Sequence, residues 1–195
     1  MAEYHLKSPF TEAEIRKLRI GDIVYFDGLL FGIRDLTQIY MFDQNHEPPV
    51  SLANAPCIHT APSLRRVGTK WEPICVGTTT STRMDRFTPP LIEKYGVRAI
   101  IGKGGLYQGS LEAMQKCGAV YLAITGGSAA LETKTIEEVE AVYWEHLHPE
   151  ALYQFRVKNF GPLTVAMDSH GGNLYEQVKA EAVRRLPAIY QKLGV

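Results

Sequence analysis

The chain has 195 residues, of which 45% are hydrophobic and 22% charged, and its 21 Lys and Arg residues balance its 21 Asp and Glu residues. This composition is ordinary for a folded globular domain and excludes a disordered chain, while the absence of a net charge excludes a basic field that would recruit nucleic acid or an anionic membrane. No signal-peptide core and no apolar run of membrane-spanning length is present. We therefore expect one cytoplasmic domain over residues 1–195, with no nucleic-acid or membrane partner.

Periodicity, capping residues and turn residues predict alternating helices and strands, and hence an α/β domain. In chain order we expect a helix at 11–20, strands at 23–26 and 29–33, a helix at 36–42, strands at 57–60 and 71–76, a helix at 89–95, a strand at 97–101, a helix at 110–117, a strand at 120–124, a helix from 135 to about 144, strands at 152–157 and 163–167, and a helix from 174 to about 185. Asp27-Gly28 predicts a hairpin between the first two strands. Thr135 with Glu138 is a capping-box pattern, and Pro187 should break or kink the last helix.

Two of the predicted strands end in glycine-rich loops that each carry one cation. The first loop, 77–83, offers several hydroxyl groups and ends at Arg83, and the second, 102–105, places Lys103 between glycines. Glycines let the backbone approach a ligand, and successive N–H groups attract anions. Arg grips a carboxylate with a two-pronged fork, whereas Lys is a compact point charge. We interpret the loops as two walls of one site for a carboxylate-bearing metabolite, and the competing interpretation is ordinary turns with solvated cations.

Other polar residues have plainer explanations. Arg34 stands between a strand and a helix start, where it can reach a ligand or pair with Asp35. His59 is a single histidine on a short strand, which favours a structural role. Asp168 and His170 lie in a glycine-rich turn with no nucleophile nearby, so a hydrogen-bonded turn is favoured over acid–base chemistry.

The three cysteines are also expected to be structural. Cys57, Cys75 and Cys117 show no C-x-x-C spacing. We interpret them as small buried hydrophobic residues and predict no metal site in this chain.

Particular motifs resemble those of a known family. Residues 77–84, Gly-Thr-Thr-Thr-Ser-Thr-Arg-Met, followed by 101–105, Ile-Gly-Lys-Gly-Gly, are similar to the signature of the β-type subunit of iron–sulfur hydro-lyases, namely class I fumarases and L-tartrate dehydratases. The segments 21–25, 156–163 and 168–174 extend the resemblance over nearly the whole chain. It implies a swivelling β/β/α domain of the class I fumarase C-terminal type.

The resemblance also implies an activity and a partner. The expected reaction is reversible hydration of fumarate to L-malate by a fumarate hydratase, with L(+)-tartrate dehydratase as the alternative. A 4Fe–4S cluster would be carried by a separate α subunit, with an α2β2 assembly expected, and none by this chain. Thr79 would act in proton transfer, while Arg34, Arg83 and Lys103 would bind a small dicarboxylic acid.

One position departs from the family pattern. In many relatives the Arg-Asp motif is followed by two further residues and a histidine, but here that position holds Gln38. Gln can form hydrogen bonds but carries no proton charge at neutral pH. A shifted substrate preference is one expected consequence. For the function of the whole chain, the alternative to an enzyme is a non-catalytic anion-binding or regulatory domain.

Overall fold

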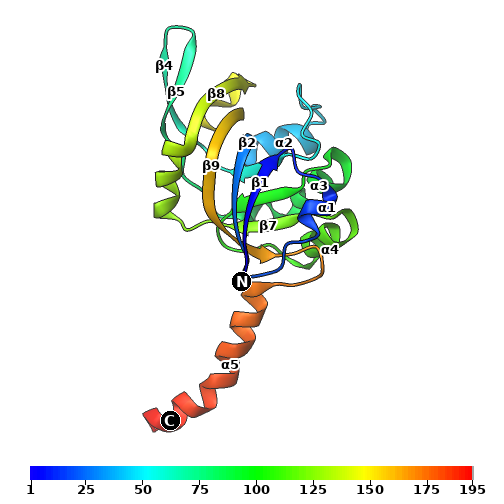
Figure 1. Cartoon of the computed structure of the whole chain (residues 1–195), viewed down its shortest axis with the longest axis vertical. Helices are drawn as coiled ribbons and strands as arrows, with labels where there is room; N and C mark the ends of the chain where they lie inside the picture. Colours follow the sequence, from blue (N-terminus) through cyan, green and yellow to red (C-terminus); the bar gives the residue numbers. More distant parts are fainter. Residues whose placement is uncertain (195) are drawn as a thin grey trace.

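The computed structural model describes residues 1–194, and its main feature is a seven-stranded sheet that curls into a barrel (Figure 1). The strand order is β1-β2-β3-β6-β7-β9-β8, and β2 (Ile23–Ile33) pairs in addition with β9 (Leu152–Met167). That extra pairing closes β2, β3, β6, β7 and β9 into a ring. The remaining strands of this sheet are β1 (Glu3–Ser8), β3 (Pro56–His59), β6 (Ala99–Gly102), β7 (Val120–Ala123) and β8 (Ile136–Tyr143).

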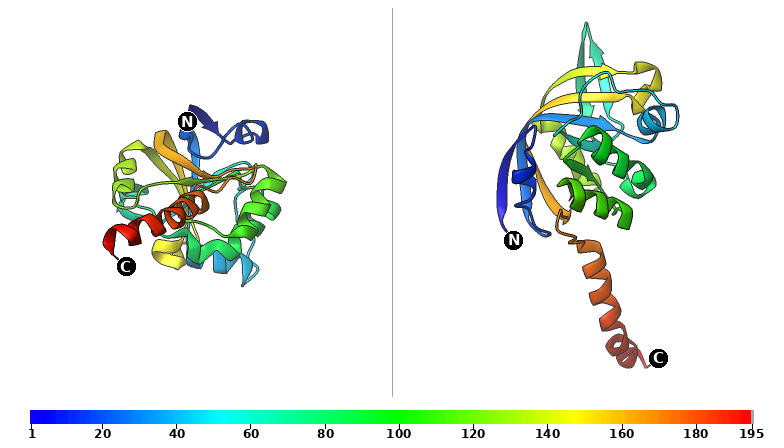
Figure 2. Two further views of the ribbon diagram at one scale, coloured as in Figure 1. Left: turned by 90° about the horizontal axis from the view of Figure 1, so that it is seen from below. Right: turned by 90° about the vertical axis from the view of Figure 1, so that its right-hand side faces the viewer.

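Short helices cover the ring, and two segments project from it. The helices of the body are α1 (Glu12–Ile15), α2 (Asp35–Phe42), α3 (Thr88–Tyr95) and α4 (Gln108–Cys117), with 3₁₀ segments η1 (Ser81–Phe87), η2 (Gly127–Thr135) and η3 (Glu145–Glu150). The hairpin of β4 (Ser63–Val67) and β5 (Lys70–Cys75) projects at one end, and α5 (Leu174–Leu193) leaves the other end (Figure 2).

The core has two parts because the parallel strands are buried on both faces. Ile58, Ile101 and Leu122 belong to a cluster with side chains from β2 and β9, so this cluster fills the ring. Their neighbours on the same strands belong to a second cluster, which includes residues of α3 and α4. The two clusters hold the ends of β3 and β6 in fixed positions, and with them the loop after β6 and Thr79, whose N–H donates to the His59 carbonyl at the end of β3.

The α/β prediction is confirmed, and most elements lie within two or three residues of their predicted bounds. The Asp27-Gly28 hairpin is wrong, because β2 continues through it from Ile23 to Ile33. Gly28 has φ of +105°, and a Cβ there would lie 2.6 Å from the Ser8 carbonyl oxygen. This glycine therefore permits close approach of β1 rather than a chain reversal.

The predicted helix from 135 to about 144 is also wrong. These residues form β8, which pairs antiparallel with β9, and Ile136 and Val139 are buried. The pairing with β9 and the burial of apolar side chains outweigh the local capping pattern of Thr135 and Glu138.

The last two predicted strands are one continuous strand, β9, with Gly161 at φ of +145° inside it. The final helix continues through Pro187 to Leu193, so the proline does not end it, and Figure 1 shows a bend in its last turns. Within residues 1–194, no helix combines the length and apolarity needed to cross a membrane.

Candidate active site

The structure brings the two glycine-rich loops together, as the sequence predicts. Thr80 and Lys103 form a parallel β-bridge. The Ser81 N–H donates to the Lys103 carbonyl at 2.8 Å, and the Lys103 N–H donates to the Thr79 carbonyl at 3.4 Å. These bonds fix the first loop against the second, because β3 and β6, the strands beneath them, are adjacent and parallel.

Two glycines of the second loop are required by this close approach. A Cβ at Gly102 would lie 1.9 Å from Ser81 Oγ. Gly104 has φ of +85°, and a Cβ there would lie 3.2 Å from Thr82 Oγ1. Any side chain at Gly102 would force the loops apart, which explains the glycines on either side of Lys103.

Thr79 lies at the contact between the first loop and an arginine. Its N–H donates to the His59 carbonyl at 2.9 Å, which holds the loop on the end of β3. Its Oγ1 accepts a hydrogen bond from Arg83 Nη2 at 3.3 Å. The Arg83 side chain is about half exposed, so it meets both Thr79 and the solvent.

Asp35, from the start of α2, joins the two arginines that the sequence predicts for this site. Its carboxylate accepts a fork from Arg83, with Nε to Oδ1 at 3.4 Å and Nη2 to Oδ2 at 2.9 Å. Arg34 Nε lies 3.4 Å from Asp35 Oδ2 and 3.6 Å from Glu150 Oε1. The ion-pair interpretation of Arg34 is therefore confirmed, and its role in ligand binding stays a prediction.

The charges of this cluster support one another. Partial burial works to raise the pKa of Asp35, but the hydrogen bond and positive charge of Arg83 outweigh it and hold that pKa below its usual value. The hydrogen bond to Asp35 likewise raises the pKa of Arg83. Both groups are therefore ionised at neutral pH, and Asp35 orients the guanidinium of Arg83.

Lys103 differs from the arginines in having no such partner. Among the described residues, its ammonium group forms no ion pair or hydrogen bond in the structure. A Cβ at Gly126 would lie 3.7 Å from Lys103 Nζ, so the loop after β7 forms a third side of the site. Gly126-Gly127 stand at the end of a strand with no cation following closely, so the local sequence does not mark them as part of the site.

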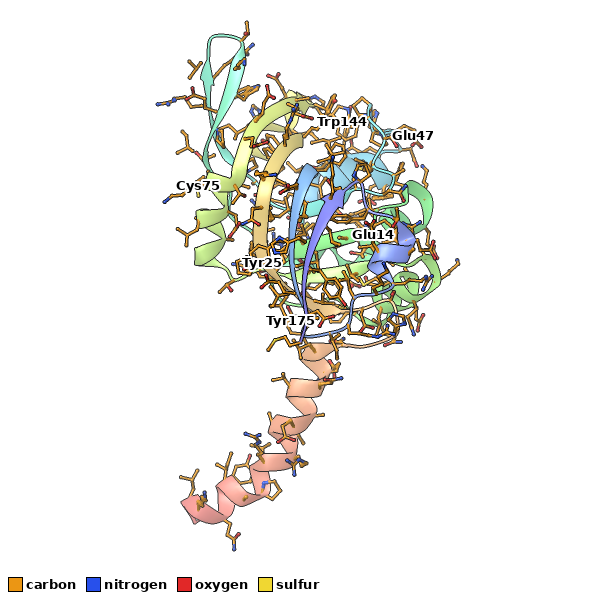
Figure 3. The ribbon with its side chains drawn as sticks, viewed as in Figure 1. Glu14, Tyr25, Glu47, Cys75, Trp144 and Tyr175 are labelled. Atoms are coloured by element: carbon orange, nitrogen blue, oxygen red, sulfur yellow. The ribbon has the colours of Figure 1, made fainter. Side chains whose placement is uncertain are left out.

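A small cavity opens beside Thr79. It is lined by Arg34, Ala61, Ser63, Cys75, Gly77, Thr78 and Thr79. Figure 3 places Cys75 at the base of the projecting hairpin. Of the three cysteines only Cys57 is buried; Cys75 is exposed and Cys117 is partly exposed, so the expectation of three buried thiols is wrong for two of them.

His59 and Gln38 are buried beneath the site. His59 Nδ1 lies 2.9 Å from Ser81 Oγ, and Ser81 Oγ accepts a hydrogen bond from Tyr121 OH at 3.0 Å. Burial lowers the pKa of His59 to about 4, so the ring is neutral at pH 7. Gln38 Nε2 donates to the Arg34 carbonyl at 3.3 Å, so the residue at the unusual position supports the Arg34 backbone. The structural interpretation of His59 is consistent with this packing.

The Asp168 turn is a hydrogen-bonded turn, as favoured from sequence. Asp168 Oδ1 accepts from the N–H groups of His170 and Gly172, each at 2.9 Å, and its Oδ2 accepts from the Ile20 N–H at 3.0 Å. His170 Nε2 lies 2.8 Å from the Arg16 carbonyl oxygen. These groups are satisfied within the fold and lie outside the candidate site.

The described residues do not assemble a metal site of their own. No group of three or more His, Cys, Asp or Glu side chains comes together in residues 1–194. The three cysteines come from the strand β3, the end of β5 and the end of α4. The residues present therefore do not fit an iron–sulfur cluster held by this chain.

Comparisons with known proteins agree on one family. The profile described as Fumarase C-terminus matches residues 1–178. The L(+)-tartrate dehydratase subunit beta of Escherichia coli strain K12 is 38% identical over 94% of this chain and 92% of its own length. A provisionally named L(+)-tartrate dehydratase subunit beta of Methanocaldococcus jannaschii is 38% identical over 90% and 93%. A provisionally named class I fumarate hydratase of Geobacillus stearothermophilus is also 38% identical over 93% of this chain, but over only 35% of its own length.

Proposed function

Because the chain belongs to the Fumarase C-terminus family, we propose that it is the β subunit of a hydro-lyase that adds or removes water on a small dicarboxylic acid. The observation that carries the proposal is the arrangement of Thr79 between Arg83 and the loop of Lys103. The Thr79 hydroxyl contacts Arg83, the Thr79 backbone contacts that of Lys103, and Thr79 and Arg34 line the same cavity. The closed barrel with covering helices supports the swivelling β/β/α fold expected for this family.

The cations have the chemistry that a dicarboxylate requires. Arg34 and Arg83 balance the negative charges of Asp35 and Glu150, so Lys103 from the second loop makes these five residues net positive by one. Lys103 has no acidic partner among the described residues and is the cation most available to a carboxylate. Arg83 keeps N–H groups outside its fork with Asp35, and these can donate to a second carboxylate oxygen.

Thr79 is suited to a role in proton transfer next to these cations. A proton α to a carboxylate is weakly acidic, and fixed positive charges stabilise the enolate-like charge that forms when it leaves. A threonine hydroxyl is a poor base by itself, so Thr79 needs an acidic or basic neighbour from outside this chain. Its hydrogen bond from Arg83 holds the hydroxyl oxygen in place for that role.

We propose that a partner α subunit completes the site and holds the 4Fe–4S cluster. The support within this chain is that its cysteines do not gather into a ligand set. The candidate cavity is open, and its rim includes the exposed Cys75, so a second protein can close over it. Purified alone, the chain should contain no iron; stoichiometric iron with a brown absorbance band would contradict this part of the proposal.

Fumarate and L-malate are the proposed substrates, and L(+)-tartrate is the second candidate. Relatives bearing either name are equally similar at 38% identity, so identity alone does not discriminate. The second candidate is supported by the L(+)-tartrate dehydratase β subunits among the relatives, which align with this chain over more than nine-tenths of their length.

Anaerobic co-expression with a cluster-bearing α subunit tests the proposal. The reconstituted pair is assayed for release or uptake of water on malate, fumarate and L(+)-tartrate, with iron content measured in parallel. Turnover of one of these acids is expected, and the ratio of kcat/KM values decides between the two candidates. Binding of dicarboxylates with no turnover, in a pair with a full cluster, would instead support a non-catalytic anion-binding domain.

A further inference from the structure

Helix α5 leaves the body with no other element alongside it (Figures 1 and 2). None of its side chains is buried. Its large apolar side chains are between 38% and 69% exposed, and they are Val178, Val183, Leu186, Ile189, Tyr190 and Leu193. A single helix with a bare apolar face is only marginally stable in water. This surface therefore requires a covering partner.

The first turn of α5 is fixed to the body. Asn173 caps the helix by accepting hydrogen bonds from the N–H groups of Tyr175 and Glu176. The Tyr175 ring packs against Gly105, so a Cβ on Gly105 would lie 3.2 Å from Tyr175 Cδ2. The centroid of the Tyr175 ring is 6.4 Å from the centroid of the Tyr121 ring. Figure 3 shows Tyr175 at the junction of helix and body. The direction of α5 is therefore set, and its remaining turns are presented outward.

The apolar side chains form one continuous face. At about 100° per residue, Val178, Ala182, Leu186 and Ile189 share one side of the helix, and they line a shallow hollow along it. Pro187 lies about 200° round the helix from Ile189, on the opposite side. A proline-induced bend has its convex side on the proline, so the last turns curve toward the apolar face and around its partner.

This face is complementary to itself. Two pairs of its members, Leu174 with Leu193 and Val178 with Ile189, are spaced symmetrically about the middle of the helix, between residues 183 and 184. An antiparallel second copy sets Val178 against Ile189 of the other copy, and Leu174 against Leu193. Near the crossing point the small Ala182 faces the larger Leu186, which lets the two helices approach closely. Such reciprocal contacts are what a two-fold symmetric interface requires.

The charges of α5 favour the same arrangement. The first half carries Glu176, Lys179 and Glu181, a net charge of one Lys minus two Glu, or −1; the second half carries Arg184, Arg185 and Lys192, or +3. Antiparallel pairing sets the negative half against the positive half, whereas parallel pairing sets +3 against +3. Glu181 already pairs with Arg184 and Arg185 of its own helix, so antiparallel pairing gains mainly from keeping the two positive halves apart and from the favourable alignment of the helix dipoles.

We propose that α5 is a dimerisation arm, through which two copies of this chain pair by antiparallel packing about an axis near residues 183 and 184. The inference does not rest on the proposed catalytic function, because it uses only the shape, apolar face and charges of α5. It explains why a long apolar helix is held away from the body that could otherwise bury it.

Sedimentation analysis of the full chain tests the dimer and its face. At roughly tens of micromolar the chain should be a dimer, and Leu186→Glu should weaken dimerisation by at least about 30-fold, because one buried apolar contact is lost in each copy. Gln191→Glu, which adds the same charge on the opposite face of α5, should leave the dimer intact. Circular dichroism verifies that both variants keep their helix content.

Disulfide cross-linking tests the antiparallel register. In a Cys75→Ser background, the chains carrying Val178→Cys alone or Ile189→Cys alone should not cross-link, because each new thiol lies far from its own copy in the partner. An equal mixture of the two chains should form a cross-linked heterodimer on mild oxidation. Cross-linking of either single variant with itself would contradict the antiparallel register.

Other results would assign the arm to a different partner. A monomeric wild-type chain, or a dimer unaffected by Leu186→Glu, would overturn the proposal. If Leu186→Glu leaves the oligomeric state unchanged but abolishes co-purification with a cluster-bearing α subunit, that subunit covers α5 instead and the second copy does not.

Discussion

The two ends of η1 present the same chemistry in different surroundings. Arg83 forms a two-pronged ion pair with Asp35 at one end. Arg86 forms the same kind of pair with Asp43 at the other end, with Arg86 Nη1 to Asp43 Oδ1 at 3.0 Å and Nη2 to Oδ2 at 2.5 Å. Arg83 also contacts Thr79, whereas Arg86 is 61% exposed and lies over the Phe87 ring. An arginine–aspartate fork is therefore not by itself a site; its position beside the glycine-rich loops makes Arg83 a candidate for substrate binding.

The largest expected difference between the two ends is in turnover. Thr79→Ala should lower kcat of the reconstituted enzyme by about 100-fold or more while leaving KM nearly unchanged, because an uncharged hydroxyl acts mainly when the proton moves. Thr88→Ala, at the far end of η1, removes a buried hydroxyl that has no hydrogen-bond partner and should leave kcat unchanged. If Thr79→Ala raises KM tenfold with kcat intact, Thr79 binds substrate and has no role in proton transfer.

The two arginines themselves give the next largest contrast. Arg83→Lys should lower kcat/KM by roughly ten- to hundred-fold, because the charge remains but the fork that recognises a carboxylate is lost. Arg86→Lys makes the same change in the same element and should alter kcat/KM by less than about twofold. Arg98→Lys is a poorer control, since Arg98 also holds Glu12, Asn54 and the Cys117 carbonyl. Equal effects at positions 83 and 86 would remove Arg83 from the site.

His59, which packs against Ser81 at the start of η1, should also make the free energy of unfolding depend on pH. The pKa of His59 is about 4 in the folded chain and about 6.5 when unfolded. The unfolded state therefore takes up the proton first, and stability falls as the pH drops from 7 to 5, by on the order of 2 kcal/mol. Urea unfolding at the two pH values measures this loss, which His59→Asn should largely abolish. Asp43, at the exposed end, has a lowered pKa and should not titrate between pH 5 and pH 7.

The smallest expected contrast concerns the aspartates. Asp35→Asn removes the charge that orients Arg83 and Arg34, and should lower kcat/KM about three- to tenfold, or about 0.7–1.4 kcal/mol. Asp43→Asn breaks an exposed pair, so activity should be unchanged and stability should fall by less than about 1 kcal/mol. Steady-state kinetics and urea unfolding of both variants check this, and an equal loss of activity in both would show that Asp35 has no special place.

Several features could be predicted from local sequence alone. The strand before residue 102 and the Lys103 that follows it could be recognised because a parallel buried strand reads as a continuous apolar run. The strand before residue 77 is instead β5, which belongs to an exposed antiparallel hairpin, so only the glycine, the hydroxyl residues and Arg83 marked the first loop. The proximity of the two loops followed from the expectation that both form one site, and the β-bridge between Thr80 and Lys103 confirms it. The sharing of Asp35 by two arginines was not visible, because it requires η1 to lie beside the start of α2.

What the sequence by itself determined was the α/β class, the order of most elements, and the residue types of the candidate site, because these depend on short-range periodicity and on motifs within one segment. The tertiary structure decided that 136–143 is a strand, that β2 passes straight through Asp27-Gly28, and that Gly126 lies beside Lys103. Each of these depends on a partner distant in the chain: β9, β1 and the loop after β6. Long-range pairing and burial outweigh local propensity there, so no local pattern could have revealed them.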